Sequence, residues 1–184
     1  PTPYRLLVGN HDDRDALLEI FPEIEHIDGF IQSADDLDDA SLLYLDTLAR
    51  DGQHHGELCP ARLKWIGDQI MSADERPLLI FQHHPPCGIG VPALDRLRLL
   101  DSDELADLVR RRRGPTHLFC GHLHRNVSGL WAGHPFASVK SPHVQFVLDM
   151  TGPKLVRSKE PPGYGVILVG QNEIGVNYCD IPAV

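Results

Sequence analysis

Histidine, asparagine, glycine and proline gather in three short islands of this 184-residue chain. The islands are Gly9-Asn10-His11-Asp12, His83-His84-Pro85-Pro86 and Gly121-His122-Leu123-His124. Imidazole nitrogens and amide oxygens are donors that suit divalent transition metals such as Mn, Fe, Co, Ni or Zn. A bound metal can polarise a phosphoryl oxygen and lower the pKa of a water molecule. The islands therefore predict metal-dependent phosphoester hydrolysis by a metal-activated hydroxide.

Each island follows an apolar run that is typical of a buried strand, and neighbouring strand ends can bring distant residues together. The runs are Leu6–Val8, Leu78–Phe81 and Leu118–Cys120. Asn10 and His11 share one sharp turn, so their side chains diverge, and one can bind metal while the other reaches the substrate. On an extended backbone His122 and His124 would face the same side and could bind one metal or straddle two.

The elements that carry these islands change in type along the chain. Helices are expected over 13–21, from Pro60 onward and over 103–112, and strands over 4–8, 30–31, 42–45, 77–81 and 116–120. After His124 come five short alternating runs, over 127–131, 135–139, 144–148, 165–169 and 174–178, which read as an antiparallel sheet. This order predicts an α/β fold, a two-sheet αββα sandwich formed by a single domain over 1–184.

The charge and composition of the chain limit the kinds of partner and setting that are expected. The net charge of −9 disfavours polyanions, so a small substrate is expected and a nucleic-acid polymer is not. The basic run Arg110–Arg113 falls at a helix end, where it suits the helix dipole.

No apolar stretch reaches the ~18 residues of a membrane span. The four cysteines include no C-x-x-C pair, which favours a reducing, cytoplasmic setting. A homodimer stays open, and so does a targeting segment, because the chain begins at Pro1 without Met.

The three islands, in this order, resemble the calcineurin-like metallophosphoesterases. The branch they resemble contains the class III cyclic-nucleotide phosphodiesterases and bacterial glycerophosphodiesterases. The similarity extends to three further segments, which are 54–58 (HHGEL), 135–138 (PFAS) and 161–165 (PPGYG). It implies the sandwich fold of that family, a binuclear metal centre, and a cyclic nucleotide or glycerophosphodiester as substrate.

The resemblance also implies roles for single residues. The second metal would be bound by Asn10, His83 and His122, and the first metal by His124. His11 would contact the phosphate and protonate the leaving group.

Two further histidines are candidates for substrate contact. His84 could touch the substrate, support a ligand through a hydrogen bond, or only pack. His55 lies beside His54 in a polar loop that could cover the substrate or simply face solvent.

Two motifs that the family carries before these islands, D-x-H and a G-D with a bridging aspartate, do not occur ahead of Gly9 in this sequence. The domain is therefore expected to be incomplete at its N-terminal side, with a partial metal centre and little or no activity by itself. Two alternatives stay open, a phosphomonoesterase or phosphoprotein phosphatase of the same fold and a non-catalytic scaffold.

Overall fold

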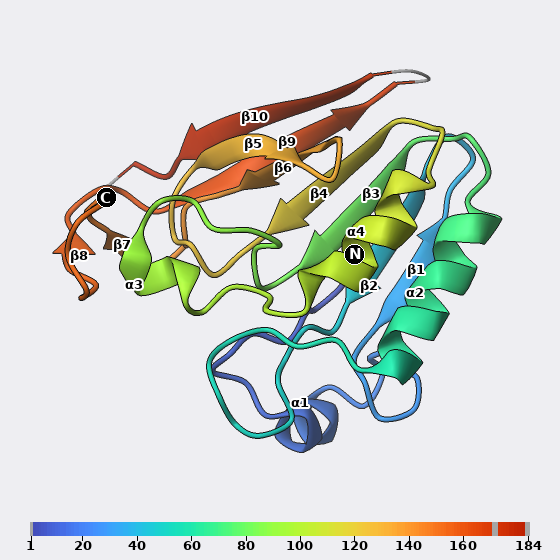
Figure 1. The fold of residues 1–184 in the computed structure, drawn as a ribbon, viewed down its shortest axis with the longest axis horizontal. Coiled ribbons are helices and arrows are strands. Elements are labelled where there is room, and N and C mark those ends of the chain that lie inside the picture. Colours follow the sequence, from blue (N-terminus) through green and yellow to red (C-terminus); the bar gives the residue numbers. More distant parts are fainter. Residues whose placement is uncertain (1, 171–172, 183–184) are drawn as a thin grey trace.

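The computed structural model describes residues 2–170 and 173–182, and a six-stranded mixed sheet dominates it (Figure 1). The strand order is β1-β2-β3-β4-β6-β5. The strands span Ser33–Asp36 (β1), Ser41–Leu45 (β2), Leu78–Gln82 (β3), Thr116–Cys120 (β4), Val127–Trp131 (β5) and His134–Ser138 (β6). Strands β2, β3, β4 and β6 run parallel, so their carboxyl ends meet at one edge, while β1 and β5 are antiparallel margins.

Two helices, α2 (Pro60–Ser72) and α4 (Ser102–Arg110), pack together over one face of the sheet (Figure 1). Their apolar residues join the inward residues of β2 to β4 in the main core, which includes Ile66, Ile70, Leu105, Val109, Leu43, Ile80 and Leu118. Pro60 occupies the first turn of α2, where a missing N–H costs nothing. Two shorter helices, α1 (Arg14–Ile20) and α3 (Pro92–Asp95), complete the helical elements of the described chain. None of its helices is both long enough and apolar enough to span a bilayer.

The opposite face of the sheet carries stacked rings from β2, β3 and β4. The ring of Phe81 lies 5.3 Å from that of Tyr44 and 5.1 Å from that of Phe119. A hairpin of β9 (Gly163–Val169) and β10 (Ile174–Asp180) lies over this face (Figure 1) and borders an open apolar pocket of about 250 Å³. A small ladder joins β7 (Gln145–Phe146) to β8 (Arg157–Ser158).

The predicted α/β class is confirmed, and three predicted elements are wrong in detail. The run 4–8 forms no strand, since its backbone pairs with none of the described strands; Val8 instead packs with Ile31 and Leu48. Residues 30–31 precede β1 rather than forming it. The later strands form no single antiparallel sheet, since β6 pairs parallel with β4 and brings β5 into the main sheet.

Candidate metal centre and adjoining pocket

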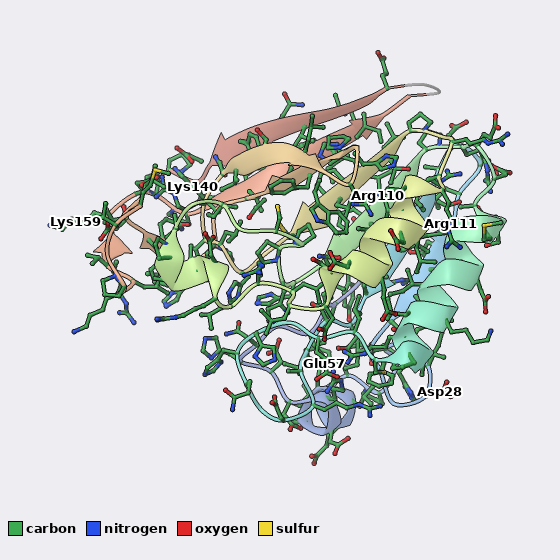
Figure 2. All side chains as sticks on the ribbon, in the orientation of Figure 1. Asp28, Glu57, Arg110, Arg111, Lys140 and Lys159 are labelled. Carbon is green, nitrogen blue, oxygen red and sulfur yellow. The ribbon has the colours of Figure 1, made fainter. Side chains whose placement is uncertain are left out.

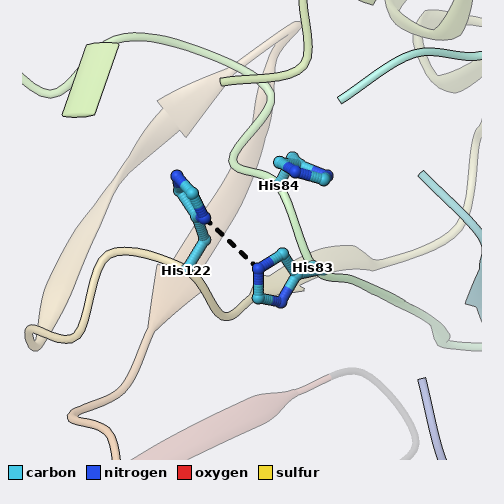
Figure 3. Close-up of side chains that lie close together, drawn as sticks. All are labelled: His83, His84 and His122. Carbon is cyan, nitrogen blue, oxygen red and sulfur yellow. Dashed lines mark hydrogen bonds between the residues drawn. The ribbon is translucent and has the colours of Figure 1, made fainter. Parts of the chain in front are cut away.

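Three donor atoms from distant parts of the chain meet at the carboxyl edge of the sheet. Asn10 Oδ1 lies 2.9 Å from His83 Nε2 and 3.3 Å from His122 Nδ1, and the two histidine nitrogens are 3.2 Å apart (Figure 3). We call Asn10, His83 and His122 the donor trio. Ligands about 2.0–2.1 Å from a tetrahedral metal lie a little over 3 Å from one another. The spacing of the trio therefore fits one shared ion.

Backbone geometry brings the trio together. Asp12 closes the turn that presents Asn10: the N–H of Gly9 donates to Asp12 Oδ2 at 2.7 Å, and the N–H of Asp12 donates to the Gly9 carbonyl at 3.0 Å. A Cβ on Gly9 would come within 2.7 Å of the His83 ring. Glycine at this position is thus what lets the ring approach the turn closely enough to reach Asn10.

Burial keeps the histidines of the trio in the form that binds metal. It lowers the pKa of His83 to about 4, with Asp12 opposing the shift, and lowers the pKa of His122 to about 3, with nearby histidines adding to it. Neutral imidazoles offer a nitrogen lone pair, which a metal needs. Charge state and spacing both fit a divalent transition metal.

His84 lies against the trio and is fully buried (Figure 3). A nitrogen of His84 falls within 4.8 Å of nitrogens of His83 and His122. Its Nδ1, however, is 2.9 Å from Thr47 Oγ1, and the Thr47 hydroxyl also accepts from the His84 backbone N–H at 3.3 Å. Burial, followed by the charges of His83 and His122, lowers its pKa to about 2. We therefore take Asn10 rather than His84 as the third member of the trio, and His84 as its packed support.

Residues 54–57 press against His84 from the loop between β2 and α2. Gly56 bridges two backbones: its N–H donates to the Arg98 carbonyl at 3.0 Å, its carbonyl accepts from the Leu100 N–H at 3.1 Å, and it pairs with Leu48 on the other side. A Cβ on Gly56 would lie 2.7 Å from the His84 ring. His55 is half-buried and near enough to His84 to lower the pKa of that imidazole further.

His124 stands apart from the trio. Its Nδ1 is 2.6 Å from the Val144 carbonyl and its ring stacks on Phe146, which leaves Nε2 for another partner. His122 and His124 adopt left-handed φ values of 61° and 51°. The expectation of an extended backbone there is wrong, because a left-handed turn redirects both rings. Non-glycine residues rarely adopt this conformation, and such strain concentrates at functional sites.

A polar pocket of about 460 Å³ opens on the other side of Asn10. His11, which is exposed, and His54 line it with ring centroids 5.1 Å apart. His54 Nδ1 lies 3.2 Å from Asn10 Nδ2 and 3.1 Å from the Asn10 carbonyl. Asn10 thus faces the donor trio with its oxygen and the pocket with its nitrogen. His11 is placed at the pocket and not in the trio.

A largely buried cluster of charged side chains around Asp46, which the sequence did not predict, borders the pocket through Arg14. Asp46, just after β2, accepts a bidentate pair of bonds from Arg14, both at 2.7 Å, and the N–H groups of Ile31 and Leu48. Arg62, fully buried, donates to the carbonyls of Asp46 and Leu48. Polar residues directly after an apolar strand, as in the three islands, were the signal that could have found Asp46 and Thr47.

The cluster extends to the surface through two further contacts of the arginines. Arg62 Nη2 donates to Glu57 Oε1 at 3.2 Å, and Glu57 is marked in the lower part of Figure 2. The guanidinium groups of Arg62, Arg50 and Arg14 lie 4.6, 5.2 and 5.3 Å from the ring of Phe30. Cations at such distances are attracted to the face of an aromatic ring.

Comparison with known proteins places this geometry in a family. The profile of the calcineurin-like phosphoesterases matches residues 1–126. The chain is 37% identical to a protein of Rhodopseudomonas palustris named as a probable cyclic nucleotide phosphodiesterase, over 96% of this chain and 66% of that protein. It is 30% identical to a probable glycerophosphodiester phosphodiesterase of Arcobacter nitrofigilis, over 80% of this chain and 55% of that protein.

Other comparisons agree. The chain is 33% identical to the cyclic adenosine monophosphate phosphodiesterase CpdA of Escherichia coli, over 52% of this chain and 34% of that protein. A dimetal phosphatase from Danio rerio shares the fold with a TM-score of 0.55 at 14% identity, over 77% of this chain and 63% of that chain. The chain spans about two thirds or less of the length of these curated relatives. The chain belongs to the calcineurin-like phosphoesterase family.

Proposed function

We propose that this chain carries the metal-dependent site of a phosphodiesterase for small substrates, either cyclic nucleotides or glycerophosphodiesters. The observation that carries the proposal is the donor trio, whose three donors lie 2.9–3.3 Å apart. Relatives named as phosphodiesterases of both substrate types support it. A divalent metal held by Asn10, His83 and His122 would polarise a phosphoryl oxygen and acidify a water.

The residues around the trio divide the remaining work. The reacting phosphate lies between the trio and His11, because Asn10 and His11 are adjacent on one turn. His11 lies in the open pocket, where it protonates the departing alkoxide. His84, held by Thr47, fixes the rings of His83 and His122. His55 belongs to the 54–57 loop that packs against His84. His124, whose Nε2 is not engaged by the Val144 contact, would offer a nitrogen to a second metal.

The trio consists of neutral donors, so we expect modest metal affinity and slow turnover by this chain. No carboxylate joins the histidine group of the described residues, and an anionic ligand would strengthen the binding.

Calorimetric titration with Mn²⁺ or Zn²⁺, followed by titration of the loaded protein with inorganic phosphate, tests the proposal. We expect one tight metal site, at the donor trio, and phosphate binding that depends on it. Hydrolysis of bis(p-nitrophenyl) phosphate, compared with the monoester of the same leaving group, then tests the preference for diesters. If the unchanged chain binds metal no more tightly than the His122→Ala variant, the proposed site is wrong. Faster hydrolysis of the monoester than of the diester would favour a phosphomonoesterase.

A further inference from the structure

The pocket beside Asn10 contains a cation that the proposed reaction does not use. Arg50 is exposed and lines the pocket with His11, Gln53 and His54. Among residues 2–170 and 173–182 it forms no ion pair with a carboxylate, whereas Arg14 in the same pocket is bound by Asp46. A guanidinium without an ionic partner, in the pocket that also contains His11, is available for a ligand.

The position of Arg50 is fixed by its neighbours. Its guanidinium lies 5.2 Å from the ring centroid of Phe30, and its Nη2 lies 3.8 Å from Cys59 Sγ. Phe30 is itself buried, and the guanidinium groups of Arg62 and Arg14 also lie near its ring. This support lowers the entropy that Arg50 would lose on binding a ligand.

The charges of the pocket select the kind of group that fits. Three carboxylates, Asp12, Asp13 and Asp15, line it together with the guanidinium groups of Arg14 and Arg50. Asp12 and Asp13 already accept backbone N–H groups. A second phosphate or a carboxylate of the substrate would meet this acidic wall. A neutral planar group with acceptor atoms would instead receive donors from Arg50 and Gln53 and a ring face from His54.

We infer that Arg50, Gln53 and His54 form a subsite for the nucleobase of the substrate and select a nucleotide over a glycerophosphodiester. The inference rests on the proposed function, since it places the phosphate at the trio and His11. The volume of about 460 Å³ leaves room for a nucleoside, and Asn10 joins the two regions by facing both.

Calorimetry on the manganese-loaded chain tests the subsite through binding rather than turnover. The ligands are adenosine monophosphate, ribose phosphate, which lacks the base, and inorganic phosphate. We expect adenosine monophosphate to bind at least about 10-fold more tightly than ribose phosphate, since stacking and two hydrogen bonds on a base contribute about that factor. Arg50→Ala should weaken the nucleotide by about 10-fold and the other two ligands by less than about 2-fold.

The matched control is Arg113→Ala, which removes an exposed arginine after α4 and should change none of the three affinities. Thermal unfolding and manganese binding show whether Arg50→Ala remains folded, and Arg50→Lys tests whether the planar group is needed. Equal binding of all three ligands by the unchanged chain would overturn the base subsite, and so would equal weakening of all three by Arg50→Ala. Absence of phosphate binding to the loaded chain would instead contradict the proposed function.

Discussion

The donor trio and the polar pocket that contains Arg50 share one residue, Asn10, yet they are opposite kinds of environment. The histidines of the trio are largely desolvated, and burial keeps them neutral. The pocket is lined mostly by exposed residues, with charges of both signs. A metal needs donors held at fixed separations. An organic group of variable shape instead needs directional donors whose bound water it can displace. The comparison suggests that affinity for metal and choice of substrate can be altered separately.

The change expected to break both regions at once is Asp46→Ala. It removes the carboxylate that holds Arg14 and lies 3.7 Å from the buried Arg62. Breaking a buried ion pair from one side costs about 3–5 kcal/mol. Urea denaturation measures the loss of unfolding free energy, and calorimetry should show weaker binding of both manganese and nucleotide.

The control for Asp46→Ala is Asp68→Ala, which removes one partner of an exposed i,i+4 pair with Lys64. Exposed pairs of this kind contribute less than about 1 kcal/mol. If the two variants unfold at the same urea concentration, the cluster does not support the site.

Acidification should act on the buried histidines of the trio. The pKa of His83 falls from its ordinary 6.5 to about 4 in the folded chain, so below about pH 6.5 the unfolded chain binds the proton first. The contribution of His83 to the stability of the metal-free protein is therefore fully present above pH 6.5 and is lost as the pH falls toward 4. The loss of unfolding free energy is on the order of 3 kcal/mol.

Urea unfolding at a series of pH values measures this loss. His83→Gln should flatten the profile, and His143→Gln, at an exposed histidine, should not. A metal-free chain equally stable at pH 7 and pH 4.5 would show that burial does not control the charge of the trio.

His122→Ala should separate the two regions. Removing one of three donors is expected to lower manganese affinity by about 100-fold, a loss comparable to that of outer-sphere and ligand changes at metal sites. Calorimetry measures it, with His143→Ala as the exposed control. Unchanged manganese affinity would mean that the three donors do not share an ion.

Thr47→Val gives the smallest expected effect and tests the support of the trio. It leaves His84 Nδ1 buried without its partner at 2.9 Å, which costs about 1–2 kcal/mol. Manganese affinity should fall a few-fold, because His84 packs against both histidines of the trio. Thr151→Val, at an exposed loop hydroxyl bonded to Asp149, is the matched control. A stability loss without any change in metal affinity would make His84 a packing residue only.

Part of this architecture was readable from the sequence because the signals were local. Strands β3 and β4, helix α2 and the glycine turn before Asn10 each declare themselves within a few residues. The convergence of Asn10, His83 and His122 followed from their place after apolar runs, although the run before Asn10 is not a strand.

What the sequence could not supply depends on contacts between distant residues. Arg50 is an ordinary loop arginine until Phe30 packs beneath it, and Arg62 reads as a helix-surface residue until Asp46 and Glu57 meet it. The turn of His124 toward Val144 likewise depends on a segment 20 positions further on.

The backbone of Gly56, hydrogen-bonded to the 98–100 segment and paired with Leu48, anchors the loop that follows Gln53 and His54 of the pocket. This pairing ties the loop to Leu48, which lines the pocket, so a ligand meets a preformed wall on this side. Exchanging the exposed side chains at positions 50 and 53 could then change the substrate preference without altering the main chain that carries them.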